Sequence, residues 1–225
     1  LASLAVACAS RSAWAKQPLH LLGLHPDSKI NGVQIGAITY SFRSMPGNAE
    51  QLLQYCIDSN ISAIELMGDS IEEYAGKPAN TIKMPPRVPG QPMKLTDEQK
   101  SQMAAYQKQV ADWRTTVSME KFEEVRKMYH KAGVNIYAFK PNALNANNTD
   151  AEVEYALKAA KALGARSVTI ELPTDPTQSK RLGDLGAKHK IYIGYHAHLQ
   201  ATDSAWDTAL AQSPYNSMNL DCGHY

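Results

Sequence analysis

The chain has little net charge, few cysteines and no long apolar run. Its 23 basic and 22 acidic residues leave a formal charge of +1, which provides no basic field for nucleic acid. No stretch approaches the ~20 apolar residues that a membrane span needs. Beyond the first fifteen residues the cysteines are Cys56 and Cys222, too few for a disulfide framework. We expect two buried thiols there, with a single bridge as the alternative.

The N-terminal segment differs in composition from the rest of the chain. The stretch LASLAVACAS (1–10) is short and uncharged. SAWA (12–15) then ends in the small-x-small pattern of a signal-peptidase site. We interpret 1–15 as a partial signal peptide and 16–30 as a linker, which predicts an exported protein, periplasmic or secreted. A buried N-terminal helix and lipid anchoring at Cys8 are the alternatives.

From residue 31 onward, strand-like runs alternate with helical patterns. The helical segments carry end signals, such as the capping-box spacing of Thr149 and Glu152 and the terminal glycines Gly133 and Gly164. Alternating strands and helices predict a parallel sheet. The strand-like runs are 33–42, 61–68, 134–141, 167–173, 191–198 and 217–225.

The phase of these runs indicates a barrel. In four of the runs, 61–68, 167–173, 191–198 and 217–225, one face is apolar, while the other face carries an ionisable group near the carboxyl end. An open sheet covered on both sides would be apolar throughout, whereas a barrel turns one face inward. We therefore predict a (β/α)₈ TIM barrel over 31–225, with an insertion at about 78–116. About six of its eight βα units are present, so we expect a fragment truncated at both ends.

The inward groups at the strand ends suggest a metal site. Carboxylates and imidazoles gathered at one mouth suit Mn²⁺, Mg²⁺, Co²⁺ or Zn²⁺. Three readings stay open: Glu65 as an inward polar group satisfied by a buried Lys or by water, His198 as an exposed loop residue, and the direction of His224. The inward set is Glu65, Glu171, His196, His198, Asp221 and, if Gly223 turns the chain, His224.

Three motifs carry a resemblance to a known family. They are ITYSFR (38–43), GYHAH (194–198) and NLDCGHY (219–225). With them, residues 31–225 resemble the sugar phosphate isomerase/epimerase family of xylose isomerase-like TIM barrels. The resemblance implies a divalent metal held by residues at the ends of strands five to eight. Two glutamates among those ligands also move protons between adjacent sugar carbons.

The resemblance assigns roles residue by residue. Asp221 matches the metal ligand on strand six, and His224 matches a substrate-contacting histidine. The strand-five glutamate of the family falls at His196, a departure that puts two-glutamate chemistry in doubt. Glu171, inward on the neighbouring strand, could supply the missing carboxylate. We therefore predict His196, Asp221 and Glu171 as metal ligands, with Glu171 and His196 also catalytic.

The expected partner is a small sugar, bound by His198, His224, Glu65 and Lys140. Because a metal-polarised carbonyl acidifies the neighbouring carbon, the prediction is an isomerase or epimerase acting through an enediolate. A lyase or dehydratase on oxidised (keto) sugars or glycosides uses the same enediolate. A non-catalytic carbohydrate-binding barrel is the other alternative, and near-neutral charge opposes a related apurinic-site endonuclease. Whether the protein forms oligomers is left open.

Overall fold

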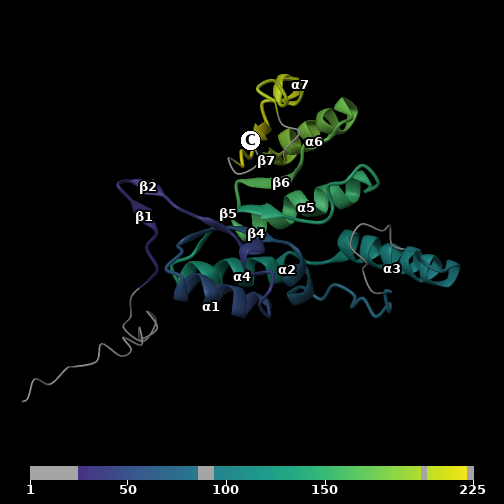
Figure 1. Cartoon of the computed structure of the whole chain (residues 1–225), viewed down its shortest axis with the longest axis horizontal. Coiled ribbons are helices and arrows are strands. Elements are labelled where there is room, and N and C mark those ends of the chain that lie inside the picture. Colours follow the sequence, from purple (N-terminus) through teal and green to yellow (C-terminus); the bar gives the residue numbers. More distant parts are fainter. Residues whose placement is uncertain (1–24, 86–93, 199–201, 222–225) are drawn as a thin grey trace, which may run out of the picture.

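The computed structural model of the protein describes residues 25–85, 94–198 and 202–221 (Figure 1). The predicted signal peptide, Cys222 and His224 lie outside these residues, so export and the two side-chain assignments stay predictions. Cys56 is buried and free, and desolvation raises the pKa of its thiol to about 12. None of the described helices combines the length and apolarity that crossing a bilayer would take.

A parallel sheet of six strands forms the centre of the fold, in the order β3-β4-β5-β6-β7-β8. Spatial order thus follows chain order, as in a barrel built from successive βα units. A separate antiparallel hairpin, β1 (Lys29–Ile30) with β2 (Val33–Gln34), precedes it. The sheet strands are β3 (Ala37–Ile38), β4 (Ala63–Met67), β5 (Asn135–Lys140), β6 (Ser167–Glu171), β7 (Tyr192–His196) and β8 (Asn216–Met218).

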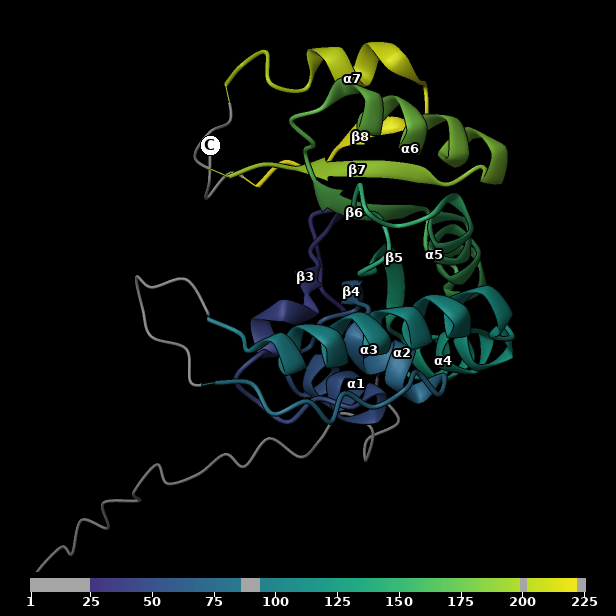
Figure 2. The ribbon, with the colours of Figure 1, turned by 90° about the vertical axis from the view of Figure 1, so that its right-hand side faces the viewer.

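The helices lie along one side of this sheet, as Figures 1 and 2 show. Their buried apolar side chains and those of the outward strand face, such as Ile64, Val168 and Ile193, make one core. The helix α3 lies within the segment predicted as an insertion. The α-helices are α1 (Ala49–Asp58), α2 (Asp69–Tyr74), α3 (Asp97–Thr116), α4 (Glu120–Lys131), α5 (Asp150–Leu163), α6 (Pro176–His189) and α7 (Asp207–Gln212).

Contacts between distant strands show that the sheet is strongly curved. In a flat sheet β4 and β8 would be about 19 Å apart, four strand spacings. Yet Asn219, just after β8, donates from Nδ2 to Oε2 of Glu65 on β4 at 3.3 Å. Thr169 on β6 also donates to Glu65, at 2.6 Å. The inward face predicted from the alternation is therefore concave, and the fold is a partial (β/α) barrel.

Local end signals place the helices as predicted. Thr149 and Glu152 form the reciprocal capping box at the start of α5, and Gly164 ends that helix in the left-handed conformation at φ +80°. Glycine is favoured there because it has no Cβ to clash. Helix α4 begins at Glu120, whose N–H donates to the Ser118 hydroxyl at 3.2 Å.

Two strand predictions were too long. Of 33–42 only Ala37–Ile38 joins the sheet, and 39–42 form a 3₁₀ turn. The reason is that Thr39 Oγ1 takes the N–H of Met67 at 2.9 Å, which a strand carbonyl would otherwise accept. In the predicted strand 217–225, the described residues pair with β7 only as far as Met218.

A buried ion network joins the insertion to the barrel. Arg114 on α3 donates from Nη2 to Glu72 on α2 at 3.3 Å and from Nη1 to Glu152 on α5 at 3.1 Å. The three side chains are 0–6% exposed. Tyr155 and Lys77 also donate to Glu72, each at 3.2 Å. Because each charge is paired, the network holds α2, α3 and α5 in one arrangement.

Glu152 makes the stability of this region depend on pH. Burial acts to raise the pKa of its carboxyl, but hydrogen bonds from the Thr149 backbone, Arg114 and Asn148 bring that pKa below its usual value. A carboxylate with a depressed folded pKa stabilises the fold above its unfolded pKa of about 4.3 and loses that contribution as the pH falls through the folded pKa.

We therefore expect both proteins to lose stability as the pH is lowered from about 5 to 3. The free energy of unfolding of Glu152→Gln should fall less over this range than that of the wild type. Urea titrations at several pH values measure this difference. Parallel curves for the two proteins would contradict the assignment.

Candidate metal centre

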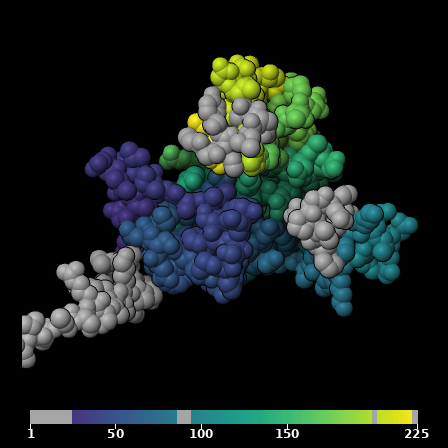
Figure 3. Space-filling model, viewed as in Figure 1, coloured from purple at the N-terminus to yellow at the C-terminus, as the bar shows by residue number. Residues whose placement is uncertain are grey.

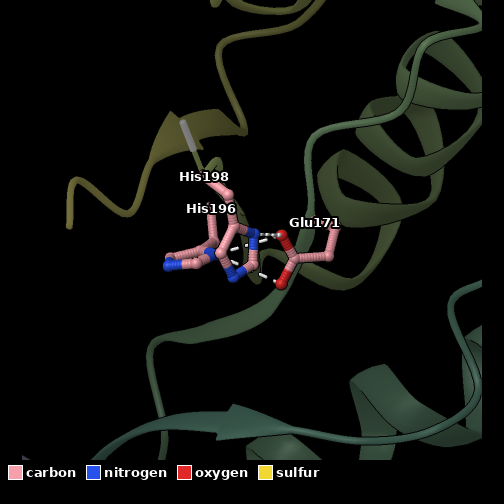
Figure 4. Close-up of side chains that lie close together, drawn as sticks. All are labelled: Glu171, His196 and His198. Carbon is pink, nitrogen blue, oxygen red and sulfur yellow. Dashed lines mark hydrogen bonds and ion pairs between the residues drawn. The ribbon is translucent and has the colours of Figure 1, made fainter. Parts of the chain in front are cut away.

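Strand register brings the two central residues of the site together. Glu171 is the last residue of β6 and His196 the last of β7, and the two are directly paired across the parallel ladder. Neighbouring strands lie about 4.8 Å apart, so paired side chains on the same face meet. Both belong to the inward face, at the carboxyl end of the sheet. Figure 4 shows the two side chains pointing toward one another.

His198 completes a cluster of three. Its Nδ1 lies 3.0 Å from Oε2 of Glu171, and His196 Nδ1 lies 3.0 Å from the same oxygen. The two imidazole rings meet edge to face at 4.6 Å between centroids. His198 follows the end of β7 and is half-exposed, as the loop reading expected, yet it faces the carboxylate (Figure 4).

Two further predicted residues border the cluster. Asp221 Oδ2 lies 3.3 Å from His196 Nε2, so His196 stands between two carboxylates. Lys140, the last residue of β5, places Nζ 3.4 Å from Oε1 of Glu171. His196 is the least exposed of the set, its side chain 13% accessible. Four predicted ligands or substrate contacts, from the ends of β5 and β6 and from the segments after β7 and β8, thus lie around His196 and its partner Glu171.

Glu65 lies apart from this cluster. Its carboxylate accepts hydrogen bonds from Thr169 and Asn219, and the residue is 5% exposed. The alternative of an inward polar group was expected to involve a buried Lys or water, whereas the partners here are a threonine hydroxyl and an asparagine amide. Its predicted contact with substrate stays a prediction. The sequence placed Thr169 and Asn219 on the inward face, but neither is ionisable, so neither was marked as part of a site.

The electrostatics favour a charged carboxylate in the cluster. Partial burial acts to raise the pKa of Glu171, but the hydrogen bond with His196 and the positive charges of His196, Lys140 and His198 lower it below its usual value. At neutral pH Glu171 is therefore an anion facing two imidazoles and an ammonium group. Such a carboxylate can bind a cation or accept a proton.

The donor set fits a divalent transition metal. One oxygen or nitrogen from each of Glu171, His196 and His198 lies within 4.8 Å of the others. In a tetrahedral zinc site with bonds of about 2.1 Å, ligand atoms are about 3.4 Å apart, close to the 3.0 Å contacts here. Imidazole and carboxylate together suit zinc, cobalt or manganese better than magnesium.

Comparison with known proteins gives matches in structure. Neither protein-family models nor curated sequences match the chain. A fusion protein described as xylose isomerase-like TIM barrel/4-hydroxyphenylpyruvate dioxygenase matches 83% of this chain and 26% of its own, with a TM-score of 0.50 and 15% identity. The fold is that of part of a TIM barrel.

Two other barrels of known structure match a larger share of their own length. The probable 3-DHS dehydratase AsbF of Bacillus anthracis aligns over 85% of this chain with a TM-score of 0.56 and 15% identity. The IolI protein, solved with a bound zinc atom, aligns over 84% with a TM-score of 0.52 and 12% identity. This chain spans 64% of the length of each. At these identities the likeness establishes the fold.

Proposed function

We propose that the protein is a divalent-metal-dependent sugar isomerase or epimerase that acts through an enediolate. The observation that carries this proposal is the convergence of Glu171, His196 and His198 at the carboxyl ends of adjacent parallel strands. In barrels of this kind, active sites form at that end of the sheet. The zinc bound to the structurally similar IolI protein adds support for a metal in such a barrel.

Each residue has a role that its contacts suit. Glu171, His196 and His198 would hold the ion, because their donor atoms converge. Asp221, the other predicted ligand, lies 3.3 Å from Nε2 on the opposite side of the His196 ring and would orient that imidazole. A bound divalent cation polarises a substrate carbonyl and stabilises the negative charge that develops on its oxygen. Glu171, anionic at neutral pH, can accept the proton from the adjacent carbon. Lys140, 3.4 Å from Glu171, brings a positive charge to the same region and can orient the substrate oxygen.

The fate of the proton decides between related reactions. Its return to the same carbon from the other face gives an epimer, and its return to the next carbon gives an isomer. Loss of a substituent from the neighbouring carbon gives dehydration. The likeness to AsbF, described as a probable dehydratase, favours keeping dehydration of oxidised sugars or glycosides as the second candidate.

Solvent deuterium exchange tests the shared step. The full chain, loaded in turn with Zn²⁺, Co²⁺ or Mn²⁺, is incubated in D₂O with free ketoses, aldoses and keto-glycosides. We expect deuterium to enter the carbon beside the carbonyl of a substrate, and the exchange to stop when a chelator removes the metal. Glu171→Gln should lower the exchange rate by about 100-fold or more, the usual contribution of a general base.

Glu124→Gln is the matched control, because Glu124 is an exposed carboxylate on α4, paired with Lys121 at 2.8 Å. It should exchange at the wild-type rate. Metal-loaded protein that binds a sugar but exchanges no deuterium would overturn the enzyme proposal and support the carbohydrate-binding alternative.

A further inference from the structure

A large cleft lies beside the helix α3. It has a volume of 1190 Å³ and is bounded by α2, one face of α3 and the segment 142–148 between β5 and α5. Figures 1 and 3 show α3 at the right-hand margin of the molecule. Pockets for single drug-sized ligands have volumes of about 300–1,000 Å³, so this cleft has room for more than one sugar ring.

The charged groups of the cleft largely neutralise one another. Lys77 pairs with Asp69 at 3.3 Å and with Glu72 at 3.2 Å. Arg114 is held between Glu72 and Glu152. Because these cations and anions are committed to internal pairs, the cleft does not offer the concentrated charge that a phosphate or a metal ion requires.

Side-chain amides supply the remaining polar groups. Each amide offers both donors and an acceptor, which matches the dual character of a sugar hydroxyl. Carboxylates hold two of these amides in place: Asn142 donates to Asp69, and Asn148 donates to Glu152, at 2.8 and 2.9 Å. The amide residues that line the cleft are Asn80, Gln107, Asn142, Asn145, Asn147 and Asn148.

The facing side of α3 adds an apolar strip. Met103, Tyr106 and Val110 all line the cleft and are spaced three and four residues apart, so they lie on one helix face. The Tyr106 hydroxyl donates to the carbonyl of Pro78 at 3.2 Å, which fixes the ring at the cleft wall. A sugar ring has apolar C–H faces and hydroxyl groups at its edges. An apolar and aromatic surface next to amide groups can therefore contact both parts of it.

We propose that this cleft binds a neutral glycan of two or more sugar units. Asn142 is two residues beyond Lys140, so the cleft begins close to the carboxyl end of β5, where the metal cluster lies. The cleft would then hold the outer sugar of a glycoside whose reacting sugar sits at the cluster. This last step rests on the proposed function, whereas glycan binding by the cleft does not.

Calorimetric titration of the full chain with cellobiose and with maltose tests the proposal. We expect saturable binding of at least one disaccharide with a Kd on the order of 1 mM, and weaker binding of glucose. The double variant Gln107→Ala/Asn147→Ala should weaken disaccharide binding at least tenfold. Both side chains are exposed, so the variant should keep its fold.

Two controls locate the binding. Lys100→Ala, exposed on the same helix and absent from the cleft lining, should bind as the wild type does. Glu124→Gln, exposed on α4 and absent from the cleft lining, should also bind the disaccharide as the wild type does. The proposal is overturned if neither disaccharide binds, or if the Gln107/Asn147 variant binds as tightly as the wild type, whether or not deuterium exchange is observed.

Discussion

Replacing His196 by alanine is expected to lower the affinity of the protein for Zn²⁺ by about 100-fold or more. Loss of a residue that only orients a metal ligand lowers metal affinity by about 10–100-fold. His196 is itself a proposed ligand, so a larger effect is expected. Its ring stands between Glu171 and Asp221, at 3.0 and 3.3 Å, so its loss leaves two carboxylates without the imidazole that bridges them. Competition with a chelating dye at neutral pH measures the change.

His130→Ala is the matched control, because this imidazole is exposed on α4. Its affinity for Zn²⁺ should equal that of the wild type. The zinc affinity of His198→Ala should lie between those of His196→Ala and His130→Ala, since the His198 side chain is half-exposed whereas that of His196 is 13% exposed. Equal zinc affinity in wild type and His196→Ala would exclude the metal centre as described.

Replacing Arg114 by methionine is expected to lower the free energy of unfolding by ~3–5 kcal/mol, the usual cost of removing one partner from a buried ion pair. Methionine fills a similar volume but leaves Glu72 and Glu152 facing one another without a shared cation. Glu72 is fully buried, so water cannot replace the lost guanidinium. Urea unfolding followed by circular dichroism measures the difference.

Lys100→Met on the same helix serves as the control. Lys100 pairs with Asp97 at 2.8 Å, but both side chains are more than half exposed, and such pairs contribute about 0.3–0.5 kcal/mol. If Arg114→Met is no less stable than Lys100→Met, the network does not anchor the insertion helix, and α3 must be held by its apolar contacts alone.

Much of the fold follows from signals that act over a few residues. A capping box at Thr149 and Glu152 satisfies the free N–H groups of α5 with side chains three residues apart, whatever surrounds them. The αL end at Gly164 is equally local. Alternation in the strands fixed which side chains turn inward, since a one-residue shift would expose the apolar face. The mouth groups Glu171 and His196 could therefore be predicted.

The strand ends were harder to predict because competing hydrogen bonds decide them. Thr39 leaves the ladder where its hydroxyl takes the N–H of Met67, a residue 28 positions away. Whether His198 faced solvent or Glu171 was also undecided from the sequence. The answer depended on the pairing of β6 with β7, which places Glu171 beside the end of β7.

The sequence by itself determined the order of strands and helices, the helix ends and the inward face that carries the candidate chemistry. These depend on side-chain period and on groups a few residues apart. Only the tertiary structure decided that Glu65 is satisfied by Thr169 and Asn219, 104 and 154 positions distant, and that Arg114 joins Glu72 to Glu152. Such contacts depend on the curvature of the sheet and on how the insertion helix packs, and neither is encoded in local spacing.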